Sequence, residues 1–488
     1  MPNGIAYLML MIWPVVCLIL FRTQKLERAL IWSILGGYLF LPPLAEFNLP
    51  LVPAMDKVSI PNLSVLLILL FALKDKVTLW PRSVLARWLV AGLVLSAIPT
   101  VLTNGDPIVF QVLGGTGPIV FYVDELPGQS VRDIGSVLIA QCLTLVPFLL
   151  ARQFLASREG LHEILLALMV GALIYSVPSL VEIRLSPQIN IWVYGFFQHS
   201  FEQMMRGGGY RPIVFLPHGL WLALFVCTGL LAAAALGRLA PHASRVRMGA
   251  VILYLAVLLV LCKSLASLAY GIVLTPIVLF LSSRWQIRLA VVFAVVAVVY
   301  PMLRNADLVP TEAIVAQAEA ISPARAQSLE YRFDNEAQLL DRAAEKPLFG
   351  WGGWGRSLIR DSETGEIISI PDGRWIIVFG TFGWLGYICE FGLLALPILL
   401  MGLYIWRQDD ADLSPLVAPL TLILGITLMD MLLNATLTPV TWLIAGAILG
   451  HAEGLLKPVG GRVPRYPLGQ TALMGGPAAK GTGKRTVL

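Results

Sequence analysis

Residues 219–236 read GLWLALFVCTGLLAAAAL, a stretch without a single charged side chain. Hydrocarbon offers no partner for backbone N–H and C=O groups, so about 20 apolar residues in a row predict an α-helix that crosses a lipid bilayer. Thirteen apolar runs, each bounded by charges or turn residues, follow one another along the chain. They cover approximately residues 4–21, 30–47, 60–73, 88–104, 134–152, 161–182, 213–236, 247–262, 267–282, 288–304, 380–405, 415–433 and 438–455.

The overall composition favours the same class of protein. Of the 488 residues, 57% are hydrophobic and 13% are charged, which is too apolar for a soluble protein of this length. We predict an all-α, polytopic membrane helix bundle of about 12–13 transmembrane helices over residues 1–456. The Gly- and Pro-rich segment 457–488 is predicted to be a disordered tail. The net charge of +5 comes from scattered residues and does not indicate nucleic-acid binding.

Basic residues mark alternate loops. The first apolar run has no Lys or Arg before it and three just after it, the reverse of the order in a signal peptide. Because cytoplasmic loops are enriched in Lys and Arg, we expect a bacterial inner-membrane protein whose N-terminus is periplasmic and whose C-terminus is cytoplasmic. This orientation turns every basic cluster to the cytoplasm: Arg22/Lys25/Arg28, Lys74/Lys76/Arg82/Arg87, Arg152/Arg158, Arg238/Arg245/Arg247, Arg284/Arg288, Arg407, and the tail.

The opposite, external loops are longer and are predicted to carry the function. They cover roughly residues 48–59, 105–133, 183–212 and 305–379, and long ordered loops in compact proteins are commonly functional. Within 305–379, the pattern over 324–344 predicts an amphipathic helix. A glycine-rich turn follows at 350–355.

Several motifs at and after this loop resemble the O-antigen ligase and O-antigen polymerase superfamily. An Arg-bearing helix is followed by a Pro-x-x-Gly-x-Gly turn and then by a helix with Gly-x-x-Gly and Glu-x-Gly patterns. The residues that carry the resemblance are Ser328–Arg332, Glu345–Gly352, Gly380–Gly386, Glu390–Gly392, the earlier Tyr210-Arg211-Pro212 and Cys262–Ser267. The resemblance covers about residues 200–460.

The resemblance implies a periplasmic-face glycosyltransferase that uses glycans linked to undecaprenyl diphosphate. The acceptor is a second lipid-linked repeat in polymerases, and a lipid A core or a protein in ligases and related enzymes. No cofactor or metal is implied. The implied partners are the lipid-linked donor and acceptor, membrane lipids, and a chain-length regulator and flippase of the same pathway.

One departure separates polymerase from ligase. Ligases of this superfamily carry an important His in the large loop, whereas 305–379 contains none and has Pro371-Asp372-Gly373-Arg374 where relatives often have His-Asn. We therefore favour a polymerase of exopolysaccharide, capsule or O-antigen repeats over a ligase.

Cationic residues are the candidates for the donor diphosphate, because guanidinium groups bind phosphate oxygens and stay charged near lipid. Arg211 and Arg332 are expected to be catalytic, and Lys263 and Arg206 to bind substrate. Arg332 has an alternative role as the i,i+4 ion-pair partner of Glu336. Arg211 has an alternative role as an interfacial lipid anchor.

The acceptor hydroxyl needs a base or hydrogen-bond acceptor, and Glu336, Asp372 and His218 are the candidates. Each has a structural alternative: Glu336 as the partner of Arg332, Asp372 as a turn former, and His218 as an interfacial histidine. None of the three stands out from sequence alone.

Three residues near the glycine-rich turn are predicted to bind the glycan: Trp351, Trp354 and Arg356. Aromatic rings can stack on sugars, although anchoring at the membrane interface is an equal alternative for the two Trp residues. Glu390 and Asp430 lie inside apolar runs and are expected to be structural or gating residues.

Two rival functions remain open. A lipid-linked glycan flippase would show internal repeats and charges at mid-bilayer depth. No twofold repeat is evident, and the polar residues are concentrated in one external loop, which favours an enzyme. A scaffold for assembly proteins would not need Arg211 or Arg332. The GxGxxG pattern at 350–355 follows a helix rather than a strand, and Asp410-Ala411-Asp412 lies on the cytoplasmic side, so neither indicates a nucleotide site.

Overall fold

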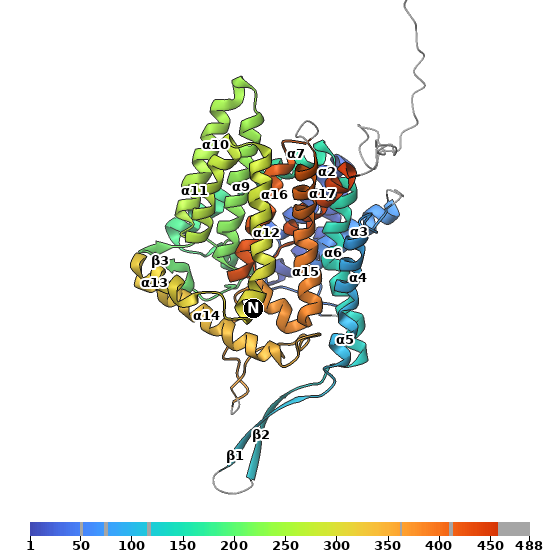
Figure 1. Ribbon diagram of the computed structural model, residues 1–488, viewed down its shortest axis with the longest axis vertical. Coiled ribbons are helices and arrows are strands. Elements are labelled where there is room, and N and C mark those ends of the chain that lie inside the picture. The colour runs from blue at the N-terminus through green and yellow to red at the C-terminus, as the bar shows by residue number, and fades with distance from the viewer. Residues whose placement is uncertain (49–51, 73–76, 115–118, 362–363, 409–412, 457–488) are drawn as a thin grey trace, which may run out of the picture.

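The computed structural model describes residues 1–48, 52–72, 77–114, 119–361, 364–408 and 413–456 and forms a bundle of long helices (Figure 1). The predicted tail and the Asp-x-Asp pattern lie outside these residues. The bundle helices are α1 (Gly4–Thr23), α2 (Leu26–Phe40), α3 (Ser59–Leu67) with a π-helical end η1 (Ile68–Ala72), α4 (Val84–Leu95), α5 (Ala97–Leu102), α6 (Val131–Phe154), α7 (Arg158–Leu185), α9 (Gly219–Leu239), α10 (His242–Leu261), α11 (Leu265–Phe280), α12 (Ser283–Asn305), α15 (Arg374–Arg407), α16 (Val417–Leu433) and α17 (Pro439–Leu455).

The predicted all-α polytopic bundle is confirmed, and each of the thirteen predicted ranges contains a helix. Among the described residues, eight helices are long and apolar enough to cross a membrane by themselves, and three further apolar helices are shorter. The chain is therefore a multi-pass helical membrane protein. Two more predicted spans, α2 and α17, have 15 and 17 residues and pack inside the bundle against α7 and α6.

Several predicted boundaries were wrong, each for a local reason. The run 213–236 becomes helical only at Gly219, because Pro217 precedes it and the His218 side chain caps the helix. The run 30–47 ends at Phe40, just before Pro42 and Pro43. The predicted helix at 380–405 already begins at Arg374, directly after Gly373.

A β-hairpin lies in the loop 105–133, where no regular structure was predicted. Strands β1 (Ile108–Gly114) and β2 (Ile119–Leu126) pair antiparallel, and their Ile and Val residues favour strands. Figure 1 shows the hairpin extending away from the helix bundle. A second, two-residue pairing joins β3 (Met205–Arg206) to β4 (Gly209–Tyr210) after the short helices α8 (Ile189–Tyr194) and η2 (Glu202–Met204).

The large loop 305–379 contains the predicted amphipathic helix and one that was not predicted. Helix α14 (Pro323–Ala344) confirms the predicted 324–344, and α13 (Thr311–Ile321) precedes it. The apolar face of α14 buries Phe333, Leu339 and Leu340, and the helix packs against α15.

Both helices and the hairpin lie at the same end of the bundle, opposite the loop between α9 and α10 (Figure 1). Helix α9 occupies the middle of one half of the bundle, packed against α7, α10 and α11, while α16 packs on α12 and α17 on α6. The helix ends that meet beneath α14 form the floor of the site described next.

Candidate functional site

The glycine motifs of the large loop hold two backbone segments together. Helix α15 is broken at Gly383, which has φ 63°, and the turn at 347–352 fills the break. Trp351 N–H donates to Gly380 O at 2.8 Å, and Trp384 N–H donates to Pro347 O at 2.7 Å. A Cβ on Gly383 would lie 2.4 Å from the Leu348 carbonyl carbon, so only glycine permits this approach. The turn thereby positions the first half of α15 against α14.

Three basic residues from two distant segments are tied together beside this half-helix. The Arg211 side chain is 6% exposed, and its Nη2 donates to Lys263 O at 2.9 Å. Lys263 lies in the tight turn between α10 and α11 with φ 52°, and its Nζ donates to Arg206 O at 2.6 Å. The structure thus brings together Arg206, Arg211 and Lys263, as predicted from sequence.

Arg332 reaches the same place from α14. Its Nε lies 3.5 Å from Asp372 Oδ2, and its Nη1 donates to Leu433 O and to Asn434 Oδ1, both at 3.2 Å. The predicted alternative, an ion pair of Arg332 with Glu336, is wrong because Asp372 takes that position. We call Arg206, Arg211, Lys263 and Arg332 the cationic cluster.

Electrostatics show that the cationic cluster is one group of charges. The pKa of Arg211 is lowered to about 10, mainly by burial and also by the charges of Arg206 and Arg332. Burial also raises the pKa of Asp372, while Arg332 and His199 act in the opposite direction. Of the four basic residues, only Arg332 is in ion-pair contact with a carboxylate, the partly exposed Asp372.

Asp430 and Asn434 orient Arg332 from below, a link that sequence analysis missed. Asn434 accepts from Arg332 through Oδ1 and donates from Nδ2 to Asp430 Oδ1 at 3.2 Å. The other oxygen of Asp430 accepts from Thr436 at 2.7 Å. The i,i+4 spacing of Asp430 and Asn434 was visible in the sequence, but their connection to α14 depends on the fold.

Two histidines lie at the edge of the cluster. His218 Nδ1 accepts from Leu220 N at 2.9 Å, and Nε2 faces Gln203 Oε1 at 3.3 Å. The His199 ring, which sequence analysis did not single out, packs on it with centroids 4.4 Å apart. The pKa of His218 is lowered to about 3, mainly by burial and also by the charges of His199 and Arg211. His218 is therefore neutral at physiological pH, with both ring nitrogens engaged.

Glu336 lies one helical turn from Arg332 but belongs to a different network. Its two oxygens accept from Tyr300 Oη at 2.9 Å, Arg304 Nε at 3.0 Å and Trp375 Nε1 at 3.2 Å. The side chain is buried. Burial raises the pKa of Glu336, although the hydrogen bonds from the three donors act in the opposite direction. These contacts join α14 to α12 and α15 and leave Glu336 little capacity to accept a substrate proton.

Trp351, Trp354 and Arg356 lie elsewhere on the loop. Trp351 is buried and two cations lie over its ring, with Arg342 Cζ 3.4 Å and Lys346 Nζ 4.6 Å from the ring centroid. Trp354 is exposed, and Arg356 is buried, with its Nη1 donating to Pro127 O at 2.8 Å. Stacking of a sugar on Trp351 is therefore blocked in this arrangement, whereas Trp354 is free to contact a ligand.

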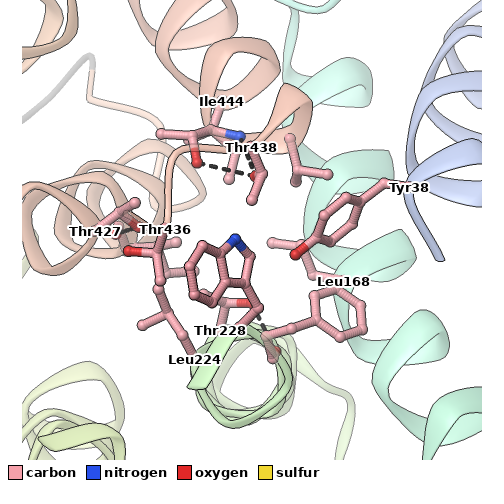
Figure 2. Close-up of a pocket in the computed structure, with 13 residues that line it drawn as sticks. Tyr38, Leu168, Leu224, Thr228, Thr427, Thr436, Thr438 and Ile444 are labelled. Atoms are coloured by element: carbon pink, nitrogen blue, oxygen red, sulfur yellow. Dashed lines mark hydrogen bonds between the residues drawn. The ribbon is translucent and has the colours of Figure 1, made fainter. Parts of the chain in front are cut away.

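A small cavity of about 40 Å³, lined by apolar side chains and several threonines, lies between α7, α9, α16 and α17. Figure 2 shows the Thr228, Thr427, Thr436 and Thr438 side chains around it, with Tyr38 on another side. Because Thr436 also donates to Asp430, the cavity borders the residues that orient Arg332. Its volume suits about two or three water molecules and is too small for a sugar.

No metal site is evident in the part of the chain that the structure describes, where no three His, Cys, Asp or Glu side chains are grouped suitably. No protein-family model matches the chain, and no curated protein matches it. The cationic cluster and Asp372 are therefore the features of the structure that indicate a function.

Proposed function

We propose that this protein is a glycosyltransferase that transfers polyprenyl-diphosphate-linked oligosaccharides outside the bacterial inner membrane and polymerises their repeats. The observation that carries the proposal is the convergence of Arg206, Arg211, Lys263 and Arg332, the last of which also contacts Asp372. These residues come from three segments separated by long stretches of sequence. A diphosphate carries the matching negative charge.

The reaction needs charge stabilisation and a proton acceptor. The acceptor hydroxyl attacks the anomeric carbon of the donor's reducing-end sugar, and the bond from that carbon to the diphosphate oxygen breaks. The leaving lipid diphosphate takes the electron pair, and Arg211, Arg332 and Lys263 stabilise its negative charge. The hydroxyl proton passes to a base.

Asp372 is the best base among the three predicted candidates. Its side chain is 33% exposed and has one ion-pair contact, at 3.5 Å, so its oxygens remain accessible to a substrate. Burial raises its pKa, which makes the carboxylate a stronger base. His218 and Glu336 have their polar atoms engaged by protein groups.

The position of the cluster favours an enzyme over the flippase alternative. Arg211 precedes the first residue of α9, Lys263 follows α10, and Asn434 follows α16. The charges therefore lie at the ends of helices, at the depth of lipid headgroups, rather than at mid-bilayer where transporters bind their substrates. The basic loops at the other end support a periplasmic position for the site.

A ligase is the second candidate, favoured by the two histidines. The large loop lacks His, but His199 and His218 from the preceding external segment pack together beside Arg211 and Arg332. A ligase-type histidine could thus be supplied by a different loop.

The glycan profile of cells lacking this protein tests the proposal and separates the two candidates. Cells are complemented with wild type, Arg211→Ala or Arg332→Ala at matched membrane levels. The control is Arg247→Ala, which changes an exposed arginine near the start of α10. A polymerase predicts single repeats on lipid and no long polymer in deletion and cluster variants. Polymer that accumulates on its lipid carrier identifies a ligase, and an unchanged profile contradicts both.

A further inference from the structure

A second charged cleft lies between the β-hairpin and the end of α14. It has a volume of about 540 Å³, within the size range of small-ligand sites. The walls come from Val109 and Phe110 of β1, Arg342 of α14, and Arg356 and Arg360 of the following segment. The hairpin projects away from the helix bundle (Figure 1), and the cleft lies at its base, beside the first residues of β1 and the last residue of β2. We call it the hairpin cleft.

The basic groups of the hairpin cleft have mostly carbonyl partners. Arg356 donates to Pro127 O and Asp106 O at 2.8 and 2.7 Å, and Arg360 donates to Gly365 O at 2.8 Å. Behind Arg356, Lys346 Nζ donates to Thr103 O and Asn104 Oδ1. Within the described residues, none of these three cations has a carboxylate partner within 4.0 Å.

These positive charges are crowded and partly desolvated. Burial lowers the pKa of Lys346 and of Arg356, and the charge of Arg342 lowers both further. The carboxylates in the lining are Glu345, which pairs with Arg342 at 2.8 Å, and Asp341. The Nε atoms of Arg356 and Arg360 are buried and have no hydrogen-bond partner in the described part of the chain. A bound anion would offset this unfavourable concentration of positive charge.

The remaining walls favour a glycan over a small inorganic anion. Val109 is 41% exposed, and Leu358 and Ile359 add apolar surface to the lining. A sugar presents C–H faces to such surface and hydroxyl or carboxylate groups to guanidinium groups. Arg332 of the cationic cluster and Arg342 of the cleft are carried by the same helix, about 15 Å apart along its axis. An oligosaccharide can therefore span both sites.

We propose that the hairpin cleft binds a carboxylate-bearing segment of the glycan while its reducing end lies at the cationic cluster. This inference rests on the proposed function and adds that the glycan is acidic.

Binding to purified full-length protein in lipid nanodiscs tests the cleft without requiring turnover. Titration calorimetry compares tetragalacturonate with neutral maltotetraose. We expect tetragalacturonate to bind at least tenfold more tightly, and this preference to weaken as NaCl is raised. Equal affinity for the two probes would overturn the proposal.

Variants locate the binding. Arg360→Gln removes a cleft charge, and Val109→Trp fills the cleft without changing its charge; each should weaken tetragalacturonate binding at least tenfold. Arg184→Gln, an exposed arginine at the end of α7, should leave it unchanged. If Arg332→Ala abolishes binding while both cleft variants bind as wild type, the probe occupies the cationic cluster and the hairpin cleft has no such role.

The result is separable from that of the glycan profile. If Arg332→Ala cells still make polymer, the proposed function fails, whatever the cleft binds. If Arg332→Ala cells lose the polymer but the cleft variants bind tetragalacturonate as wild type does, the proposed function stands and the hairpin cleft does not bind the glycan.

Discussion

Arg152 of α6 and Glu453 of α17 pair at 3.1 Å with side chains only 5% exposed, at the end of the bundle that carries the basic loops. At the opposite end, Arg332 and Asp372 are separated by 3.5 Å and are 25% and 33% exposed. Glu453 also accepts from the backbone N–H groups of Arg82 and Ser83, both at 2.8 Å. The Arg152–Glu453 pair is enclosed by protein, whereas the Arg332 and Asp372 side chains are partly exposed and can contact a ligand.

The partners of a buried or half-buried charged residue therefore decide whether it indicates a structural contact or a ligand site. A buried pair with matched donors holds helices together, and breaking it leaves an uncompensated charge. The cationic cluster has one carboxylate in ion-pair contact for four basic residues, an imbalance that an anionic ligand would relieve. Substitutions at the two ends of the bundle should therefore differ in their effect on glycan transfer.

Removing a cationic-cluster charge should have the largest effect. Arg332→Ala is expected to lower the transfer rate by about 10²–10³-fold, because developing charge on the leaving diphosphate loses a stabilising donor. The rate is measured in membrane vesicles with a lipid-linked donor, normalised to protein level. Arg247→Ala serves as the matched control, and a twofold loss or less in Arg332→Ala would place the reaction elsewhere.

Asp372→Asn should lower the rate by about 10²-fold, because it removes the proposed base. In the wild type the carboxylate form is active, so the rate should fall as the pH drops through the pKa of Asp372. Burial raises that pKa above the ordinary 3.8, which moves the acid limb upward. The pH profile of single-turnover transfer measures this limb; its persistence in Asp372→Asn would exclude Asp372 as its source.

Asp430→Asn should have an intermediate effect, about tenfold on the maximal rate, because Asn434 would lose the carboxylate that orients it toward Arg332. Thr427→Val is the control, since Thr427 lines the same cavity and donates to Ile423 O rather than to Asp430. Donor saturation curves, normalised to the amount of folded protein, give the kcat of each variant and keep a lower kcat distinct from a loss of folded protein. Equal kcat values for the two variants would mean that Asp430 does not position Arg332.

Arg152→Gln should leave the transfer rate per folded molecule unchanged. Its effect is on stability, about 3–5 kcal/mol, because Glu453 loses its buried partner. Thermal unfolding in detergent, followed by retention of the monodisperse peak, measures this loss. A lowered rate in the fraction that stays folded would show that the two ends of the bundle are coupled.

Much of the candidate site could be predicted because it consists of charged residues in a mostly apolar sequence. Arg211 and Lys263 are charged residues at the edges of apolar runs, Arg332 stands on the predicted amphipathic helix of the large loop, and the structure brings the three together. Glu336 could not be distinguished from Asp372 by sequence, since the choice depends on whether Tyr300, Arg304 and Trp375 surround the carboxylate. His199 and Asn434 were missed because neither carries a local signal.

The chain by itself determined the all-α bundle, since long uncharged runs have few alternatives to helix in hydrocarbon. It also determined which helix ends carry charge, and that the glycine-rich turn cannot continue a helix. Only the tertiary structure decided how the turn enters the break at Gly383, where β1 and β2 pair, and which carboxylate stays accessible. These outcomes depend on contacts between residues far apart in sequence, which local propensity and hydropathy do not encode.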